Sequence, residues 1–151
     1  MASKTPLNAK NLETLGAARL ANLLIEISTD SAVAKRRLRL ELAGAQSPKE
    51  AGREVAKRLT SIGRAKSSIG WKNRKPLVTD LQSQFRAIKE QIAPGDPTDA
   101  LALAWRFMQV ATPLFERCDD SSNIVIGVFH DASAELGEIA LAARLSPELL
   151  A

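Results

Sequence analysis

The sequence predicts an all-α fold, a bundle of antiparallel helical hairpins with about six helices, of the kind that begins an α-solenoid. Ala, Leu, Arg, Glu and Lys dominate the 151 residues, whereas only 4% are aromatic and tyrosine is absent. That mixture favours helix over strand. Apolar residues recur at helical spacing, and helix-start signals recur in SPKE (47–50) and DPTD (96–99).

Two helices are predicted before residue 47. The first runs from about Asn8 or Asn11 to Ser28, since four apolar residues share one face. Asp30 is expected to cap the second helix, which ends near Gly44. The apolar face of the first helix consists of Leu20, Leu23, Leu24 and Ile27.

Local signals are strongest for the third helix. Ser47 is a suitable N-cap, Pro48 suits the first helical position, and Glu50 stands where a capping box requires it. The third helix should therefore run from residue 48 to about residue 66. A fourth is expected to start near Lys75 or Pro76. Its apolar seam consists of Val78, Leu81, Phe85, Ile88 and Ile92.

The fifth helix repeats the start signal, with Asp96 as cap and Pro97 at the first position. Pro113 lies inside it, so we expect a kink or a break at 109–112, because proline removes one backbone hydrogen bond and clashes with the preceding turn. The face expected to be buried consists of Leu101, Ala104, Trp105 and Met108.

The segment CDDSSNIVIGVFH (118–130) holds the only cysteine and the only histidine of the chain. A sixth helix is predicted from residue 121 or 122, so Cys118 and His130 lie on the order of 13 Å apart along its axis, too far for a nucleophile and its base. Asp119 or Asp120 is expected to cap this helix. His130 is expected to pack against Ile126, and neither Cys118 nor His130 to bind metal.

Motifs for common catalytic and cofactor sites are absent from the sequence, which contains no glycine-rich phosphate loop, HExxH, CxxC or GxSxG. We therefore expect no enzymatic activity, cofactor or metal. One cysteine forms no internal disulfide, and no apolar run reaches the roughly 18 residues that a membrane span needs. The first ten residues lack the apolar core of a signal peptide, so a cytoplasmic location is expected.

Charge is unevenly distributed. Residues 1–75 contain 16 Lys and Arg against 6 Asp and Glu, whereas residues 76–151 contain 5 against 11, giving net charges of +10 and −6. The asymmetry indicates either an anionic partner for the first half or attraction between the halves.

Two basic clusters, in AKRRLRLEL (34–42) and RAKSSIGWKNRK (64–75), are candidates for contacts with a nucleic acid or another anionic partner. Cations neutralise phosphates, and tryptophan stacks on bases. The alternative is that the cations are solvated and that Trp71 is an apolar anchor at the helix start. The candidate residues are Lys35, Arg36, Arg39, Trp71, Lys72, Arg74 and Lys75.

SPELLA (146–151) has the signals of a helix start but fewer than two turns of helix, so we expect a single all-α domain, 1–151, that is the N-terminal part of a longer protein. Four segments carry a resemblance to a known family: LNAKNLETLGAARLANLLIEIS (7–28), AKRRLRLELAGAQSP (34–48), DPTDALALAWRFM (96–108) and FERCDDSS (115–122). Through them the chain resembles, over nearly its whole length, the N-terminal region of an uncharacterised family of longer proteobacterial proteins. That resemblance implies a helical-repeat-like parent and supplies no functional residues.

The function predicted from these observations is a helical scaffold or protein-interaction module without a catalytic site, because helical hairpins are the unit of partner-binding solenoids. Its partner would be another protein or the C-terminal part of the parent chain. Binding to a membrane is not expected. The alternative is a nucleic-acid-binding module that uses the basic half.

Overall fold

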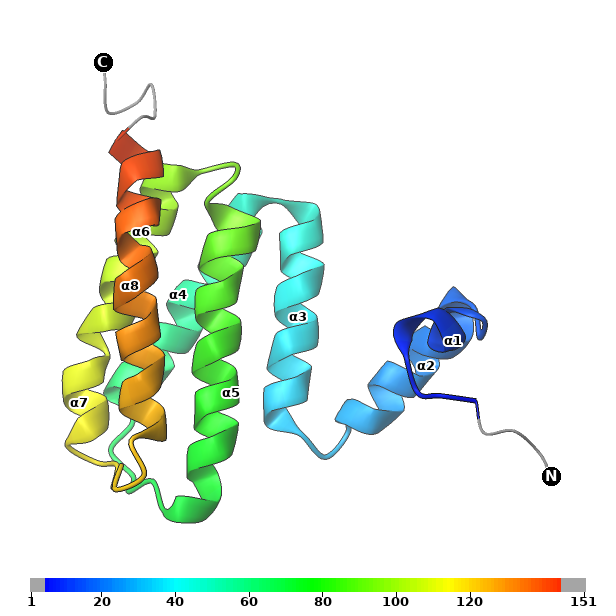
Figure 1. Ribbon diagram of the computed structural model, residues 1–151, viewed down its shortest axis with the longest axis horizontal. Coiled ribbons are helices and arrows are strands. Elements are labelled where there is room, and N and C mark those ends of the chain that lie inside the picture. The colour runs from blue at the N-terminus through cyan, green and yellow to red at the C-terminus, as the bar shows by residue number, and fades with distance from the viewer. Residues whose placement is uncertain (1–4, 145–151) are drawn as a thin grey trace. The chain divides into compact units, whose positions relative to one another are not determined.

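Helices account for nearly all of the regular structure in residues 5–144, the part of the chain that the computed structural model describes (Figure 1). The predicted all-α class is confirmed there: one isolated β-bridge, between Ile69 and Cys118, is the only strand-like pairing in residues 5–144. SPELLA lies outside the described residues. The elements are α1 (Ala9–Glu13), α2 (Ala17–Ser28), α3 (Ala32–Gln46), α4 (Pro48–Arg64), α5 (Trp71–Ala87), the π-helical η1 (Ile88–Ile92), α6 (Pro97–Gln109), α7 (Ala111–Phe115) and α8 (Ile124–Arg144).

The chain forms two compact units, residues 1–35 and 36–151. In the first unit, the prediction of one continuous helix up to Ser28 is wrong. Gly16 separates α1 from α2 at a φ of 82°, a conformation that glycine adopts without a Cβ clash. The cap predicted for α3 is also wrong, since Ser31 rather than Asp30 fills that role: its Oγ accepts a hydrogen bond from the Ala34 N–H at 3.1 Å.

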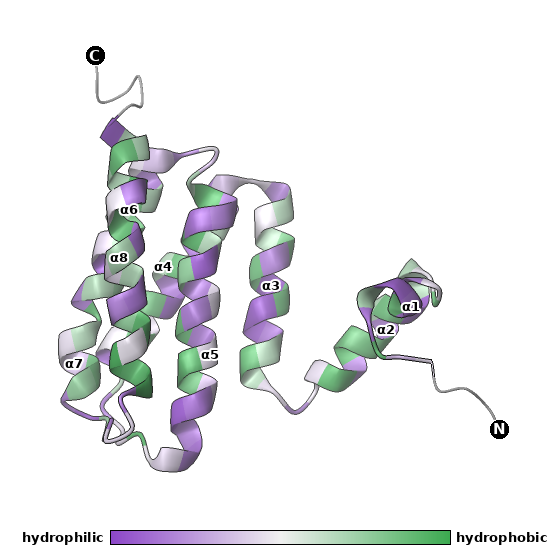
Figure 2. Ribbon diagram, in the orientation of Figure 1, coloured by the Kyte–Doolittle hydropathy of each residue, from purple (hydrophilic) through white to green (hydrophobic). Residues whose placement is uncertain are grey.

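In the second unit, α8 packs against α5 and α6, and α4 packs against the same two helices (Figure 1). Colour bands alternate along these helices between hydrophobic and hydrophilic, as expected for helices that bury one face (Figure 2). The four phenylalanines meet in the core or, in the case of Phe115, against it. Their ring centroids lie 5.1 Å apart for Phe85 and Phe107, 5.2 Å for Phe107 and Phe129, and 5.8 Å for Phe115 and Phe129.

The start of α4 is confirmed, since Ser47 Oγ accepts the Glu50 N–H at 3.1 Å. The start of α5 lies a turn before the predicted one, at Trp71, with Pro76 inside the helix. Upstream, the Ile69 N–H donates to the Arg117 carbonyl at 2.8 Å. This contact with a distant segment holds the residues just before the helix, and local sequence signals do not reveal it.

The start of α6 is confirmed, since Asp96 Oδ1 accepts the Asp99 N–H at 3.0 Å. The break expected before Pro113 is confirmed too, because α6 ends at Gln109 and α7 begins at Ala111. The buried face of α6 was predicted one residue out of step: Trp105 is 58% exposed, whereas Phe107 is fully buried. The residues of α6 that are buried are Ala100, Leu103, Ala104 and Phe107.

Among the described helices, none combines the length and the apolar character that crossing a lipid bilayer requires.

Candidate functional site

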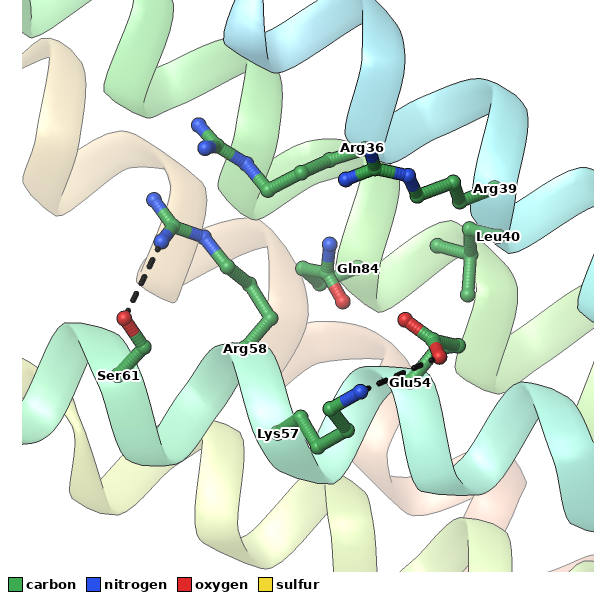
Figure 3. A pocket seen from close by; sticks show the side chains of 8 residues that line it. All are labelled: Arg36, Arg39, Leu40, Glu54, Lys57, Arg58, Ser61 and Gln84. Atoms are coloured by element: carbon green, nitrogen blue, oxygen red, sulfur yellow. Dashed lines mark hydrogen bonds and ion pairs between the residues drawn. The ribbon is translucent and has the colours of Figure 1, made fainter.

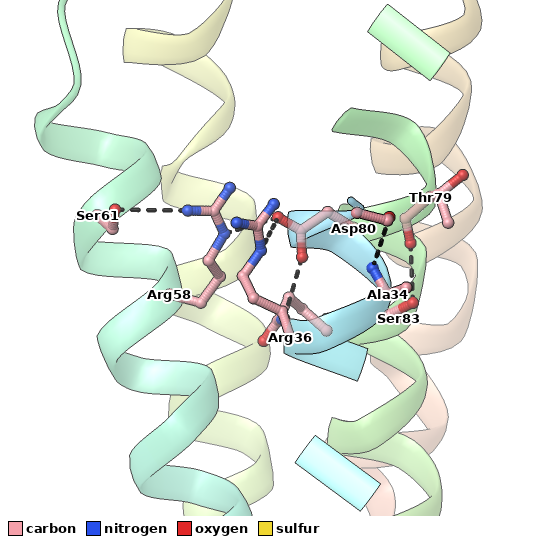
Figure 4. A network of polar contacts seen from close by, with 9 residues as sticks. Ala34, Arg36, Arg58, Ser61, Thr79, Asp80 and Ser83 are labelled. Carbon is pink, nitrogen blue, oxygen red and sulfur yellow. Dashed lines mark hydrogen bonds and ion pairs between the residues drawn. The ribbon is translucent and has the colours of Figure 1, made fainter. Parts of the chain in front are cut away.

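A buried carboxylate lies among basic side chains in the second unit. The side chain of Asp80, on α5, is 2% exposed. Arg58 Nε, from α4, donates to its Oδ2 at 2.6 Å, and Gln84 Nε2, one turn further along α5, donates to its Oδ1 at 3.2 Å. Arg36 Nε, from α3, lies 3.3 Å from Oδ2 without the alignment of a hydrogen bond (Figure 4). Asp80 therefore ties three helices together.

Next to this network lies a pocket of about 230 Å³ between α3, α4 and α5 (Figure 3). Four of its lining side chains are cationic, and one, Glu54, is a carboxylate, which lies 3.7 Å from Lys57 Nζ. With Asp80 counted, the local formal charge is +2, so the pocket attracts anions. The lining residues are Arg36, Arg39, Leu40, Glu54, Lys57, Arg58, Ser61 and Gln84.

The sequence indicated Arg36 and Arg39 but not Lys57, Arg58 or Gln84. Arg36 and Arg39 stand in an obvious cationic cluster on one helix, whereas the others come from two further helices that the sequence does not place beside it. One signal was present: Asp80 and Gln84 lie beside Leu81 and Phe85 on the face of α5 that turns inward. Polar residues on a core face need polar partners.

Of the candidate residues outside the pocket, Arg74 is engaged within the protein. Its guanidinium donates to the Asp119 carbonyl at 3.0 Å and to the hydroxyls of Ser121 and Ser122 at 3.5 and 3.3 Å. It therefore holds the link that precedes α8. Lys35, on α3 in the first unit, is exposed.

The other candidates near the start of α5 are exposed. Trp71 is 71% exposed, with Lys72 Nζ 5.6 Å from its ring centroid, and Lys75 is exposed as well. Trp71 lies nine residues before Asp80, and at about 100° per residue the two stand on opposite sides of α5. Trp71 therefore lies away from the side of α5 on which Asp80 contacts Arg36 and Arg58.

The link CDDSS acts as a helix cap, as predicted. Asp120 accepts hydrogen bonds from the Val125 N–H at 3.0 Å and the Ile126 N–H at 2.8 Å. The predicted packing of His130 against Ile126 is wrong, because the His130 side chain is 83% exposed and lies beside Asp131. In residues 5–144 no group of metal-ligating side chains has the arrangement of a metal site.

Cys118 is half-buried in this link, and its surroundings work against ionisation. Burial raises the pKa of the thiol, Asp120 and Asp119 raise it further, and Arg74 and Arg117 oppose them. We expect Cys118 to react with iodoacetamide at pH 7.5 more slowly than a free cysteine, since only the thiolate attacks. Denatured protein provides the control. Native and denatured protein reacting at equal rates would contradict this environment.

A second surface feature lies on α6. Trp105 is flanked at four and three residues by Leu101 and Met108, which are half-buried against the core. These three form an apolar stripe along one side of the helix, at the edge of the core. We call them the α6 stripe.

Comparison with known proteins leaves the function open. A family model described as "Family of unknown function (DUF6880)" matches residues 2–151. No curated protein and no solved structure matches the chain.

Proposed function

Since the chain belongs to this family of unknown function, we propose its role from its own surface: it is a non-catalytic helical module that binds a partner protein through the α6 stripe. The observation that carries the proposal is the placement of the aromatic side chains. The four phenylalanines pack in or against the core, whereas both tryptophans, Trp71 and Trp105, are more than half exposed.

Exposed tryptophan on an apolar stripe is characteristic of binding surfaces. Tryptophan is enriched among the residues that dominate interface energetics, because a rigid ring buries a large area at a small cost in conformational entropy. Leu101 and Met108 supply the apolar rim beside Trp105, and Met108 adapts its shape readily.

The test is affinity capture from a lysate of the source organism with quantitative mass spectrometry, comparing the wild-type chain with Trp105→Ala and Trp71→Ala. We expect one partner to be retained by the wild type and by Trp71→Ala, and depleted at least about tenfold by Trp105→Ala, as for a residue central to an interface. Equal recovery with all three proteins would refute the role of the α6 stripe. Circular dichroism melting of each variant serves as the folding control.

A second candidate, nucleic-acid binding, is favoured by one observation: Trp71 is exposed beside the exposed cations Lys72 and Lys75. It predicts that affinity for an oligonucleotide falls steeply with salt and that the double variant Lys72→Ala/Lys75→Ala flattens the slope. Under the protein-binding proposal the dissociation constant stays above about 10 μM even in low salt, which is within the non-specific range.

A further inference from the structure

We propose that the pocket between α3, α4 and α5 is a binding site for inorganic phosphate, which carries anionic oxygens and an O–H on the same small group. This site is separate from the α6 stripe. The positive charge of the lining, a buried hydrogen-bond acceptor and the volume of the pocket all suit this ion.

The charge comes from both walls. Arg36 and Arg39 stand on α3, and Lys57 and Arg58 on α4, so cations face each other across the pocket (Figure 3). The carboxylates of Asp80 and Glu54 do not occupy all of the N–H donors that these cationic side chains offer. Arg58 uses Nε for Asp80 and Nη1 for the Ser61 hydroxyl at 3.4 Å, and within residues 5–144 Arg36 makes only the unaligned contact with that carboxylate. Guanidinium groups with free N–H donors fit a tetrahedral oxyanion.

The acceptor is the Gln84 side chain, which is 3% exposed. A carboxylate only accepts hydrogen bonds, so the Gln84 amide must turn its NH₂ toward Asp80 and its Oε1 away. Among the residues that the structure describes, Oε1 has no hydrogen-bond donor. In Figure 3 the Gln84 amide lies between the cationic side chains of the two walls. A buried amide oxygen without a donor is costly, and a ligand O–H would satisfy it once a shift of the Gln84 side chain brings Oε1, which is closed to solvent in the unliganded protein, to the pocket surface.

These features distinguish between oxyanions. Sulfate carries no proton in neutral solution and offers Gln84 nothing. A phosphate monoester loses its last proton near pH 6, whereas inorganic phosphate keeps one O–H throughout the neutral range. A volume of about 230 Å³ is below that of common organic-ligand pockets, about 300 to 1,000 Å³, which also suits a small ion.

Phosphate bound here would also connect α3 to the rest of the unit. Leu40 is the only buried residue of α3, so the helix is attached by little apolar contact. An anion held by Arg39 and Lys57 would bridge α3 and α4. We therefore expect phosphate to slow amide hydrogen exchange in residues 36–46, the part of α3 in the second unit.

The experiment is calorimetric titration of the full chain at pH 8 and constant ionic strength with inorganic phosphate, sulfate or phenyl phosphate. We expect phosphate to bind with a dissociation constant below about 1 mM, and each of the other two at least about tenfold more weakly. The double variant Arg39→Ala/Lys57→Ala should weaken phosphate binding at least about tenfold and abolish the protection of α3. Lys72→Ala/Lys75→Ala removes the same charge from exposed positions at the start of α5 that do not line the pocket, and it should leave binding unchanged.

Gln84→Met isolates the acceptor, since it keeps the side-chain volume and removes the amide. Phosphate should then lose its advantage over sulfate. Equal binding of phosphate and sulfate by the wild-type chain would overturn the proposal whether or not this variant folds. The proposal also fails if the two double variants lose phosphate binding equally, because the attraction would then belong to the net charge. None of these outcomes depends on Trp105 or on a partner protein.

Discussion

Phe107→Ala should destabilise the chain by about 3 to 5 kcal/mol, the range found when a buried aromatic ring is replaced by a methyl group. Phe107 is fully buried, and its ring lies between those of Phe85 and Phe129. Removing it leaves a cavity at the centre of the row of rings and also removes two aromatic contacts. Since domains of this size are stable by about 5 to 15 kcal/mol, a large part of the total would be lost. Urea denaturation measures it.

Trp105→Ala is the matched control, because it removes an aromatic ring from the same helix at a position that is 58% exposed. It should cost less than half as much, since most of the ring already contacts water. Equal destabilisation by the two variants would show that the burial assigned to α6 is wrong.

The two stripes of α6 show where sequence reasoning reaches its limit. Positions 100, 103, 104 and 107 and positions 101, 104, 105 and 108 are both apolar at helical spacing. The pattern alone does not choose between faces about 100° apart. The choice depends on α4, η1 and α8, which pack against α6, and on Phe85 of α5, whose ring contacts that of Phe107. The sequence-based prediction chose the stripe that contains Trp105, because tryptophan is the larger apolar side chain. In the structure the stripe that contains Phe107 is buried instead.

Helix caps and breaks, which depend on only a few neighbouring residues, were predicted more reliably. Ser47, Asp96 and Asp120 accept hydrogen bonds from helix N-termini, and Pro113 follows a break, because each effect needs only neighbouring backbone. The start of α5 was missed for the opposite reason, since the contact that positions the preceding residues involves Arg117. Only part of the pocket lining was predicted. Arg36 and Arg39 are close together in the sequence, whereas Lys57, Arg58 and Gln84 come from helices that only the fold places beside them.

The Asp80 network leads to a prediction in which stability and binding change in opposite directions. Asp80→Ala should destabilise the chain by about 3 kcal/mol, because it leaves Arg58 and Arg36, whose side chains are only 24% and 29% exposed, without their carboxylate. This value is at the low end of the destabilisation that breaking a buried ion pair causes, because both guanidinium groups retain some contact with water.

The comparison that identifies the cause is a double-mutant cycle with Arg58→Met. If the cost of Asp80→Ala comes from stranded charge, the double variant should recover at least about 1 kcal/mol relative to the sum of the two single variants. Additive losses would contradict the ion-pair explanation.

Under the phosphate proposal, Asp80→Ala also raises the charge of the pocket by one unit and frees both guanidinium groups, so phosphate should bind more tightly while the protein without phosphate becomes less stable. A variant that loses both stability and phosphate affinity would indicate that Asp80 shapes the pocket rather than competing with phosphate for its cations.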